Sequence, residues 1–185
     1  AFMAYIFVTV PFYTIAIYMI AYTKNHLGLT EEQALQINSL SMATMLITIF
    51  PAARLADKIG RRPVLLMAIV AMILLTYPAF TLMQSGTFLA VLGGQAILAM
   101  ILGWYLGPIP AVLVEVFPAS IRYTGLSLAH NLCAILGGFT PSVAEWLIRT
   151  SNSNMSIMWL LIGAGALSFI SVVTYKDQWR DPLPI

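Results

Sequence analysis

The chain has 185 residues, of which 60% are hydrophobic and only 9% are charged. Because a soluble globular domain carries about 25% charged residues, this composition excludes a soluble domain and favours a protein that is surrounded by lipid. The formal net charge of +2 excludes a nucleic-acid-binding protein, which needs a basic face that follows the phosphates.

Stretches without Asp, Glu, Lys or Arg mark the membrane spans, since a helix needs about 20 residues to cross the hydrocarbon core. One stretch, 63–114, is too long for a single helix, and 84–86 is its natural turn. Thr30 and Gln33 have the spacing of a capping box and are expected to begin the second span. We predict an all-α membrane protein with spans at roughly 1–23, 33–54, 64–84, 87–114, 124–148 and 155–175, followed by a short tail at 176–185.

The basic residues assign an orientation to these spans. If the spans alternate in direction, seven Lys and Arg residues fall on one side, and two, Lys24 and Arg149, fall on the other. Loops rich in Lys and Arg face the cytoplasm. We therefore expect the 54–63 loop, the 115–123 loop and the C-terminal tail to be cytoplasmic.

The segment 54–63 reads Arg-Leu-Ala-Asp-Lys-Ile-Gly-Arg-Arg-Pro. It resembles the signature loop of the major facilitator superfamily, which runs Gly-x-Leu-x-Asp-Arg-x-Gly-Arg-Arg and joins the second and third helices of each six-helix half. This chain departs from that pattern at Ala53, where the family has its first glycine. A carboxylate at Asp57 can pair with an arginine across a tight turn at Gly60, and such pairs bias a rocking equilibrium. The residues expected in a cytoplasmic gate are Asp57, Gly60, Arg61 and Arg62, the alternative being a topogenic basic loop without a gating role.

A second motif lies between the fourth and fifth predicted spans. It comprises Gly-Pro-Ile-Pro at 107–110, Glu-Val-Phe-Pro at 115–118 and Arg-Tyr-Thr-Gly at 122–125. This junction resembles the C-terminal half of two branches of the superfamily, the sugar porters and the metabolite:proton symporters. The first span lacks the paired glutamines of sugar porters, and the tail lacks their Pro-Glu-Thr-Lys-Gly motif, so the second branch fits better. Glu115 and Arg122 are added to the gate as an ion pair, the alternative being a static pair or two solvated charges.

No Asp, Glu, Lys or Arg lies near a predicted membrane midplane, so we expect the proton carrier in a missing N-terminal six-helix half. The resemblance implies that the first and fourth spans line a central cavity, where aromatic faces attract a quaternary ammonium group. The alternative for these rings is interfacial or packing roles. The second span is unusually polar, with Asn38, Ser39, Ser41, Thr44 and Thr48, and positions 37, 41, 44 and 48 fall on one face that we expect to be wet. Candidate substrate contacts are Tyr13, Tyr18, Trp104, Tyr105 and Asn131.

These observations predict a multi-pass protein of the bacterial inner membrane that carries out proton-coupled symport of a small osmolyte, such as proline or glycine betaine, by alternating access. Its expected partners are membrane lipid, the solute, the proton and the missing half. We expect no cofactor, metal or nucleic acid, and no enzyme activity, because there is no nucleophile–base spacing or phosphate loop. The alternatives are symport of a dicarboxylate, another metabolite or a sugar, and a non-transporting receptor or assembly subunit.

Overall fold

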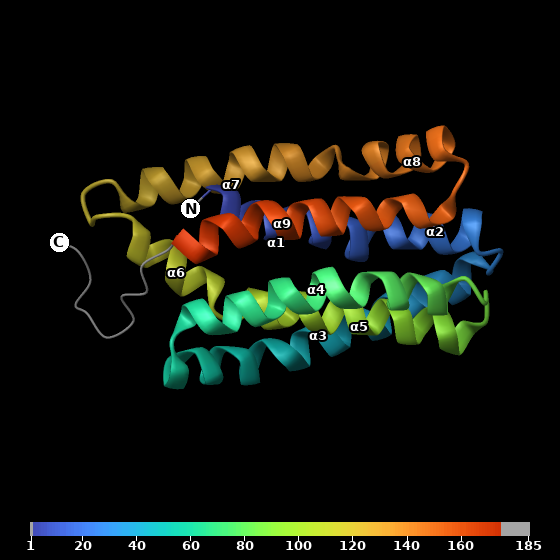
Figure 1. Cartoon of the computed structure of the whole chain (residues 1–185), viewed down its shortest axis with the longest axis horizontal. Helices are drawn as coiled ribbons and strands as arrows, with labels where there is room; N and C mark the ends of the chain where they lie inside the picture. The colour runs from blue at the N-terminus through green and yellow to red at the C-terminus, as the bar shows by residue number, and fades with distance from the viewer. Residues whose placement is uncertain (1, 175–185) are drawn as a thin grey trace.

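A computed structural model describes residues 2–174, and these residues form a bundle of helices that run along one long axis (Figure 1). Six helical segments in this part of the chain are long and apolar enough to cross a membrane. The predicted all-α membrane fold is therefore confirmed for these residues, whereas the tail at 176–185 lies outside them. In chain order the elements are α1 (Phe2–Phe12), the π-helix η1 (Tyr13–Tyr18), α2 (Met19–His26), α3 (Glu31–Ile59), α4 (Arg61–Met83), α5 (Phe88–Leu106), α6 (Ile109–Val116), α7 (Arg122–Gly138), α8 (Thr140–Ser151), the 3-10 helix η2 (Asn154–Ile157) and α9 (Met158–Thr174).

The spans are built from these elements in a simple way. The first span joins α1, η1 and α2, the fourth joins α5 and α6, the fifth joins α7 and α8, and the sixth joins η2 and α9. Figure 1 shows α3, α4 and α5 grouped on one side of the bundle and the other three spans grouped on the other side. Helix α9 packs against both α1 and α4 and so connects the two groups.

The second span begins and ends at residues that the sequence marks. The Thr30 hydroxyl accepts from the Gln33 backbone N–H at 3.3 Å, and the Gln33 side chain accepts from the Thr30 backbone N–H at 3.1 Å. This reciprocal arrangement is a capping box, as predicted. At the other end, Gly60 separates α3 from α4 with a φ of 99°, a conformation that side chains with a Cβ rarely adopt.

Small residues let α3 and α5 approach closely. A Cβ added at Gly103 would lie 2.6 Å from the Met45 carbonyl oxygen and closer still to the Thr48 hydroxyl, and one at Gly107 would lie 2.9 Å from the Ile49 carbonyl oxygen. A side chain at either glycine would therefore push the two helices apart.

The prediction of a wet face on the second span is wrong. Ile37 and Ser41 are fully buried, and the Thr48 hydroxyl lies 3.3 Å from the Met100 carbonyl oxygen of α5, to which it donates a hydrogen bond. The reason is that Thr44 and Thr48 donate to backbone carbonyls within their own helix, which satisfies these two hydroxyls inside a packed interface. Thr44, for example, donates to the Ser41 carbonyl oxygen at 2.7 Å.

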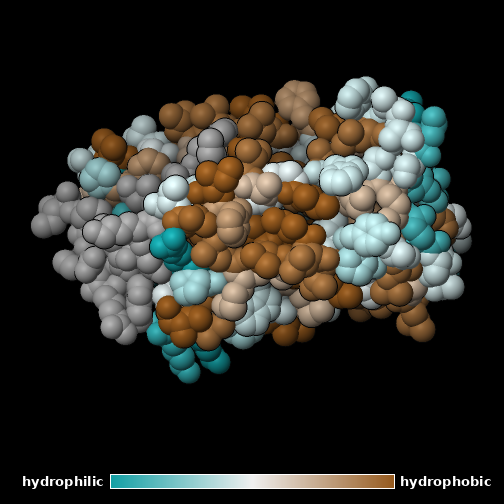
Figure 2. Space-filling model, viewed as in Figure 1, coloured by the Kyte–Doolittle hydropathy of each residue, from teal (hydrophilic) through white to brown (hydrophobic). Residues whose placement is uncertain are grey.

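The surface is divided into an apolar middle and two polar ends. On the face drawn in Figure 2, hydrophobic residues cover much of the middle of the bundle, and hydrophilic residues gather towards its ends. Large apolar side chains such as Ile47, Phe50 and Leu74 are more than half exposed, which is favourable against lipid or another helical unit. We call one end the basic end, after Arg54, Lys58, Arg61, Arg62 and Arg122, and the other the opposite end, which carries Lys24, Glu31, Glu32, Glu145 and Arg149.

Candidate functional site

The basic end contains an ion pair that joins α4 to α6. Arg61, the first residue of α4, donates from Nη1 to Oε1 of Glu115, which lies in the last turn of α6. The two side chains are only 16% and 10% exposed. Water therefore screens this pair weakly, and the loss of one partner would leave the other charge buried. The sequence marked both residues for a gate but did not pair them with each other.

The other predicted gate residues lie around this pair. Arg62 donates from Nη2 to the Val173 carbonyl oxygen at 2.5 Å and so fastens the start of α4 to the end of α9. Arg122 donates from Nε to the Phe117 carbonyl oxygen at 3.1 Å, within the connection between α6 and α7.

Asp57 behaves differently from these residues. Its side chain is exposed near the end of α3, and it forms no ion pair with any residue in the range 2–174. The expected pair between Asp57 and an arginine across Gly60 is absent from this conformation, in which Arg61 reaches Glu115 instead. The structure therefore brings together Arg61 and Glu115 and leaves Asp57 facing outward.

Trp104 and Tyr105 are neighbours in sequence but point to different sides of α5. The Tyr105 ring is fully buried, and its hydroxyl donates to the Ala4 carbonyl oxygen at 2.8 Å and lies 3.0 Å from the Ser168 hydroxyl. Trp104 is half-buried and lines an apolar groove of about 500 Å³ between α4 and α5, together with residues such as Met67. These two residues therefore do not share a pocket.

The other three candidate contacts are also separated. Tyr13 packs against Gly137, where an added Cβ would lie 2.8 Å from the tyrosine ring. Tyr18 is buried and donates to Glu145 at 2.7 Å. Asn131 is exposed on α7 and donates to the Ser127 carbonyl oxygen within its own helix. The five candidates thus line the first, fourth and fifth spans without converging on one enclosed site.

A buried amide network lies where the first span changes from α-helix to π-helix. Gln95 of α5 is 1% exposed and donates from Nε2 to the Ile15 carbonyl oxygen at 3.1 Å and to Oδ1 of Asn38 at 2.8 Å. Asn38 of α3 in turn donates to the Ala16 carbonyl oxygen at 3.2 Å. Both carbonyls belong to η1. Neighbouring helices thus satisfy backbone groups at the irregular turn, which is the condition for such a turn inside a membrane. Sequence reasoning missed Gln95, although a lone amide in an apolar span was a usable signal.

The opposite end holds a second polar cluster, centred on Glu145 of α8. Its Oε1 accepts from Nε of Arg149 at 3.0 Å, so the two residues form an ion pair one helical turn apart. Its Oε2 accepts from the Tyr18 hydroxyl at 2.7 Å and lies 3.2 Å from Nε2 of His26. Sequence reasoning did not find these contacts between the first and fifth spans, because they join residues more than 100 positions apart.

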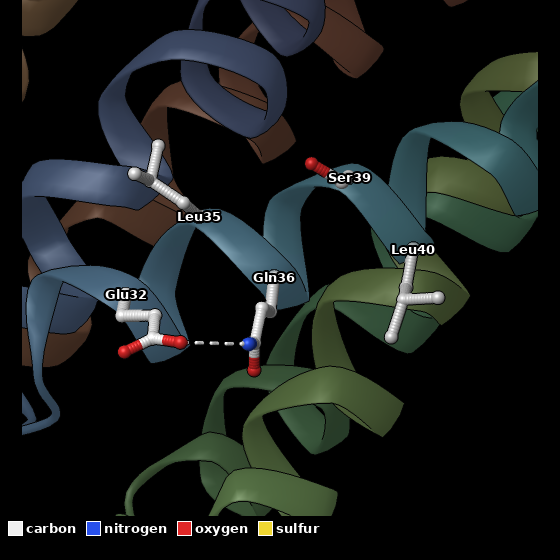
Figure 3. A pocket seen from close by; sticks show the side chains of 5 residues that line it. All are labelled: Glu32, Leu35, Gln36, Ser39 and Leu40. Carbon is white, nitrogen blue, oxygen red and sulfur yellow. Dashed lines mark hydrogen bonds between the residues drawn. The ribbon is translucent and has the colours of Figure 1, made fainter.

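A shallow hollow lies on the exposed face of α3 near the same end (Figure 3). Gln36 donates to Glu32 at 3.3 Å along one edge of it. All of its lining residues come from one helix, at the spacing of a single helical face, so it is a surface groove and not an enclosed ligand site. The lining residues are Glu32, Leu35, Gln36, Ser39 and Leu40.

Within residues 2–174, no group of three or more His, Cys, Asp and Glu side chains is arranged to hold a metal ion. The sequence model of the Major Facilitator Superfamily matches residues 1–184. The chain belongs to the Major Facilitator Superfamily. Members of this superfamily are membrane transporters and not enzymes, and the resemblance of the 54–63 loop to its signature is thereby confirmed.

Among curated members of the superfamily, the chain is 32% identical over 174 residues to the proline/betaine transporter of Escherichia coli K12. It is 29% identical over 174 residues to a glycine betaine/proline/ectoine/pipecolic acid transporter of Dickeya dadantii, and 24% identical over 172 residues to an ectoine/proline transporter of Corynebacterium glutamicum. These matches cover 94%, 94% and 92% of this chain but only 35%, 35% and 34% of the relatives. The chain therefore spans about a third of the length of these curated relatives.

Proposed function

We propose that the complete protein containing this chain couples the uptake of a small zwitterionic osmolyte, such as proline or glycine betaine, to the entry of protons. The observation that carries this proposal is the similarity, over more than nine-tenths of the chain, to bacterial transporters named for proline, betaine and ectoine.

In this proposal the chain is the C-terminal six-helix unit of a twelve-helix transporter in the bacterial inner membrane. The basic end faces the cytoplasm, as does the C-terminus, because Lys and Arg collect on the cytoplasmic side of membrane proteins. The two six-helix units rock about a central site, and the basic end closes and opens in turn. The gate residues are Asp57, Gly60, Arg61, Arg62, Glu115 and Arg122.

The Arg61–Glu115 pair supports the gating role, because it joins two spans and is largely buried. Two packed arrangements of such a contact give a two-state element, whereas a solvated pair would exert little bias. Of the candidate solute contacts, Asn131 is exposed and Tyr13 is half-buried, so both are accessible to a solute at the face of this unit. Tyr105 acts instead through packing in this conformation, since its hydroxyl is engaged by Ala4 and Ser168.

The test is uptake by proteoliposomes that contain the complete protein. Radiolabelled proline, glycine betaine, ectoine and citrate are supplied with and without an inward proton gradient, and a protonophore is added as a control. We expect gradient-dependent uptake of the zwitterions and none of citrate. Accumulation of citrate alone would replace the osmolyte by a carboxylate substrate, and no uptake of any solute would refute the transporter proposal.

A matched pair of variants examines the gate in the same vesicles. Glu115→Gln removes the charge that pairs with Arg61, whereas Glu32→Gln removes an exposed charge at the opposite end. We expect Glu115→Gln to lower the maximal uptake rate while solute binding persists, and Glu32→Gln to leave both unchanged. Equal behaviour of the two variants would contradict a gating role for the Arg61–Glu115 pair.

A further inference from the structure

The cluster around Glu145 joins the end of the first span to the fifth span through one titratable contact. His26 is the last residue of α2, and its Nε2 lies 3.2 Å from Oε2 of Glu145. The two side chains are 18% and 32% exposed, so the contact is partly shielded but open to protons from the adjacent water. Histidine is the side chain whose charge ordinarily changes between pH 5 and 8.

The remaining contacts of this end do not depend on a proton near neutral pH. The Tyr22 hydroxyl donates to the Asn154 carbonyl oxygen at 3.0 Å and accepts from the Gln84 side chain at 3.0 Å. The Asn154 side chain donates to the His26 carbonyl oxygen at 3.4 Å. These hydroxyl and amide contacts hold the backbone of α2 near η2 and α4. The imidazole of His26 is the side chain of α2 that contacts Glu145 on α8.

Glu145 is the charged side chain that contacts the His26 imidazole within the described residues. Arg149 already engages Oε1 of this carboxylate, and Lys24 is paired with Glu31 at 2.6 Å on the other side of the α2–α3 connection. A neutral imidazole donates to Oε2 in one tautomer and turns a lone pair towards it in the other. A protonated imidazole donates in every case, and a charge-assisted hydrogen bond is roughly twice as strong as a neutral one.

The irregular turn of the first span makes α2 the segment that this contact can move. Helix α2 is separated from α1 by η1, and π-helical turns of this kind allow the two parts of a helix to adopt different directions. The amides of Gln95 and Asn38 hold η1 itself. A change at His26 therefore acts on the segment beyond η1 and leaves α1 in the bundle.

We propose that His26 and Glu145, together with the Tyr18 hydroxyl, form a proton-binding site that holds α2 against α8 when His26 is protonated. In the orientation proposed above, on which this inference rests, the site faces the outer solution. Acidification on that side tightens the His26–Glu145 contact between α2 and α8, and neutral pH weakens it, while the Tyr18 hydroxyl stays bonded to Glu145. The site thereby makes the conformation of this unit sensitive to the proton that drives uptake.

The test measures the distance between α2 and α8 in the complete protein. Spin labels are placed through Asn25→Cys and Thr150→Cys, both at exposed positions, and distances are recorded by pulsed electron paramagnetic resonance at about pH 5.5 and about pH 7.5. We expect the shorter distance to dominate at the lower pH and its population to fall severalfold at the higher pH. A distance distribution that does not change with pH would overturn the proposal.

Three variants identify the groups responsible. His26→Gln keeps an N–H donor but does not titrate, so the pH dependence is expected to disappear. Glu145→Gln is expected to remove it as well, since the acceptor charge is lost. Glu32→Gln, which removes an exposed carboxylate at the same end, serves as the control. We expect its distance distribution to show the same pH dependence as that of the parent protein. A titration that persists in both His26→Gln and Glu145→Gln would assign the effect to other groups and refute the site.

This measurement needs no solute, so it separates the site from the proposed transport. A pH-dependent distance in a protein that takes up no solute would leave the proton-binding site standing and remove the transport function. Proton-driven uptake of proline with a pH-independent distance would support transport and overturn the site. The uptake of His26→Gln adds a second reading, because we expect its rate to lose its dependence on external pH while retaining its response to solute concentration.

Discussion

The largely buried Arg61–Glu115 pair provides the most quantitative prediction. Breaking a buried ion pair costs about 3–5 kcal/mol, because the remaining charge keeps its desolvation penalty. The two side chains are 16% and 10% exposed and lie at the end of the bundle, so water offsets part of that desolvation penalty. We therefore expect a coupling free energy of about 2 kcal/mol, which corresponds to a factor of about 30 in an equilibrium constant.

A double-mutant cycle with Arg61→Gln, Glu115→Gln and the combined variant measures this coupling from unfolding in detergent. Each single variant is expected to be clearly less stable than the parent protein, and the combined variant to be less destabilised than the sum of the two. The exposed Lys24–Glu31 pair is the internal control, and its coupling should be unresolved at about 0.15 M salt. Additive effects of Arg61→Gln and Glu115→Gln would refute the reasoning, because they would mean that the two charges do not stabilise each other.

Further predictions concern the gate, the amide network and the α3–α5 crossing. Asp57→Asn should slow uptake while leaving solute binding and the stability of this conformation unchanged, and unaltered turnover would argue against a gating role. Gln95→Leu removes the donor to the Ile15 carbonyl oxygen and should cost about 1–3 kcal/mol in unfolding free energy, since a buried acceptor is left without a partner. Gly103→Ala should destabilise the protein by about 1–3 kcal/mol because α3 has to move. Gly163→Ala, whose added Cβ has no neighbour within 4 Å, is the matched control, and equal thermal unfolding of these two variants would contradict the close crossing.

The sequence was sufficient for features that depend on local pattern. Apolar length predicted helices that cross a membrane, because a span of lipid requires a fixed length of helix. The capping box at Thr30 and the turn at Gly60 were also readable, since each depends on residues within a few positions.

Contacts between distant helices were not readable in this way. The ion pair between Arg61 and Glu115 joins residues 54 positions apart on α4 and α6, so no local pattern indicates it. The polar face of the second span was expected to be wet because Ser and Thr are polar, but the backbone carbonyls of their own helix satisfy Thr44 and Thr48. Periodicity gives the face of a helix on which a residue lies but not the neighbour that covers that face.

The π-helical turn was hidden for a different reason. A hydropathy profile shows only a continuous apolar segment here. The one local sign of an irregular helix was Pro11, in the last turn of α1 before η1. Gln95 is the other sign, and it lies 80 positions away in α5. Only the folded arrangement shows that the two features belong together.

The presence of η1 also affects how the first span should be aligned with other sequences. A π-helical turn takes more residues than an α-helical turn, so the two parts of this span are out of phase with each other by part of a turn. Phe7 and Ala4 face α5 and α9, whereas Tyr18 and Tyr22 face α8, η2 and the end of α4, and no single helical wheel places all four correctly. Loss of one residue between positions 13 and 18 would preserve the hydrophobic length of the span and yet rotate α2 away from Glu145. In this segment, the number of residues matters as much as their identity.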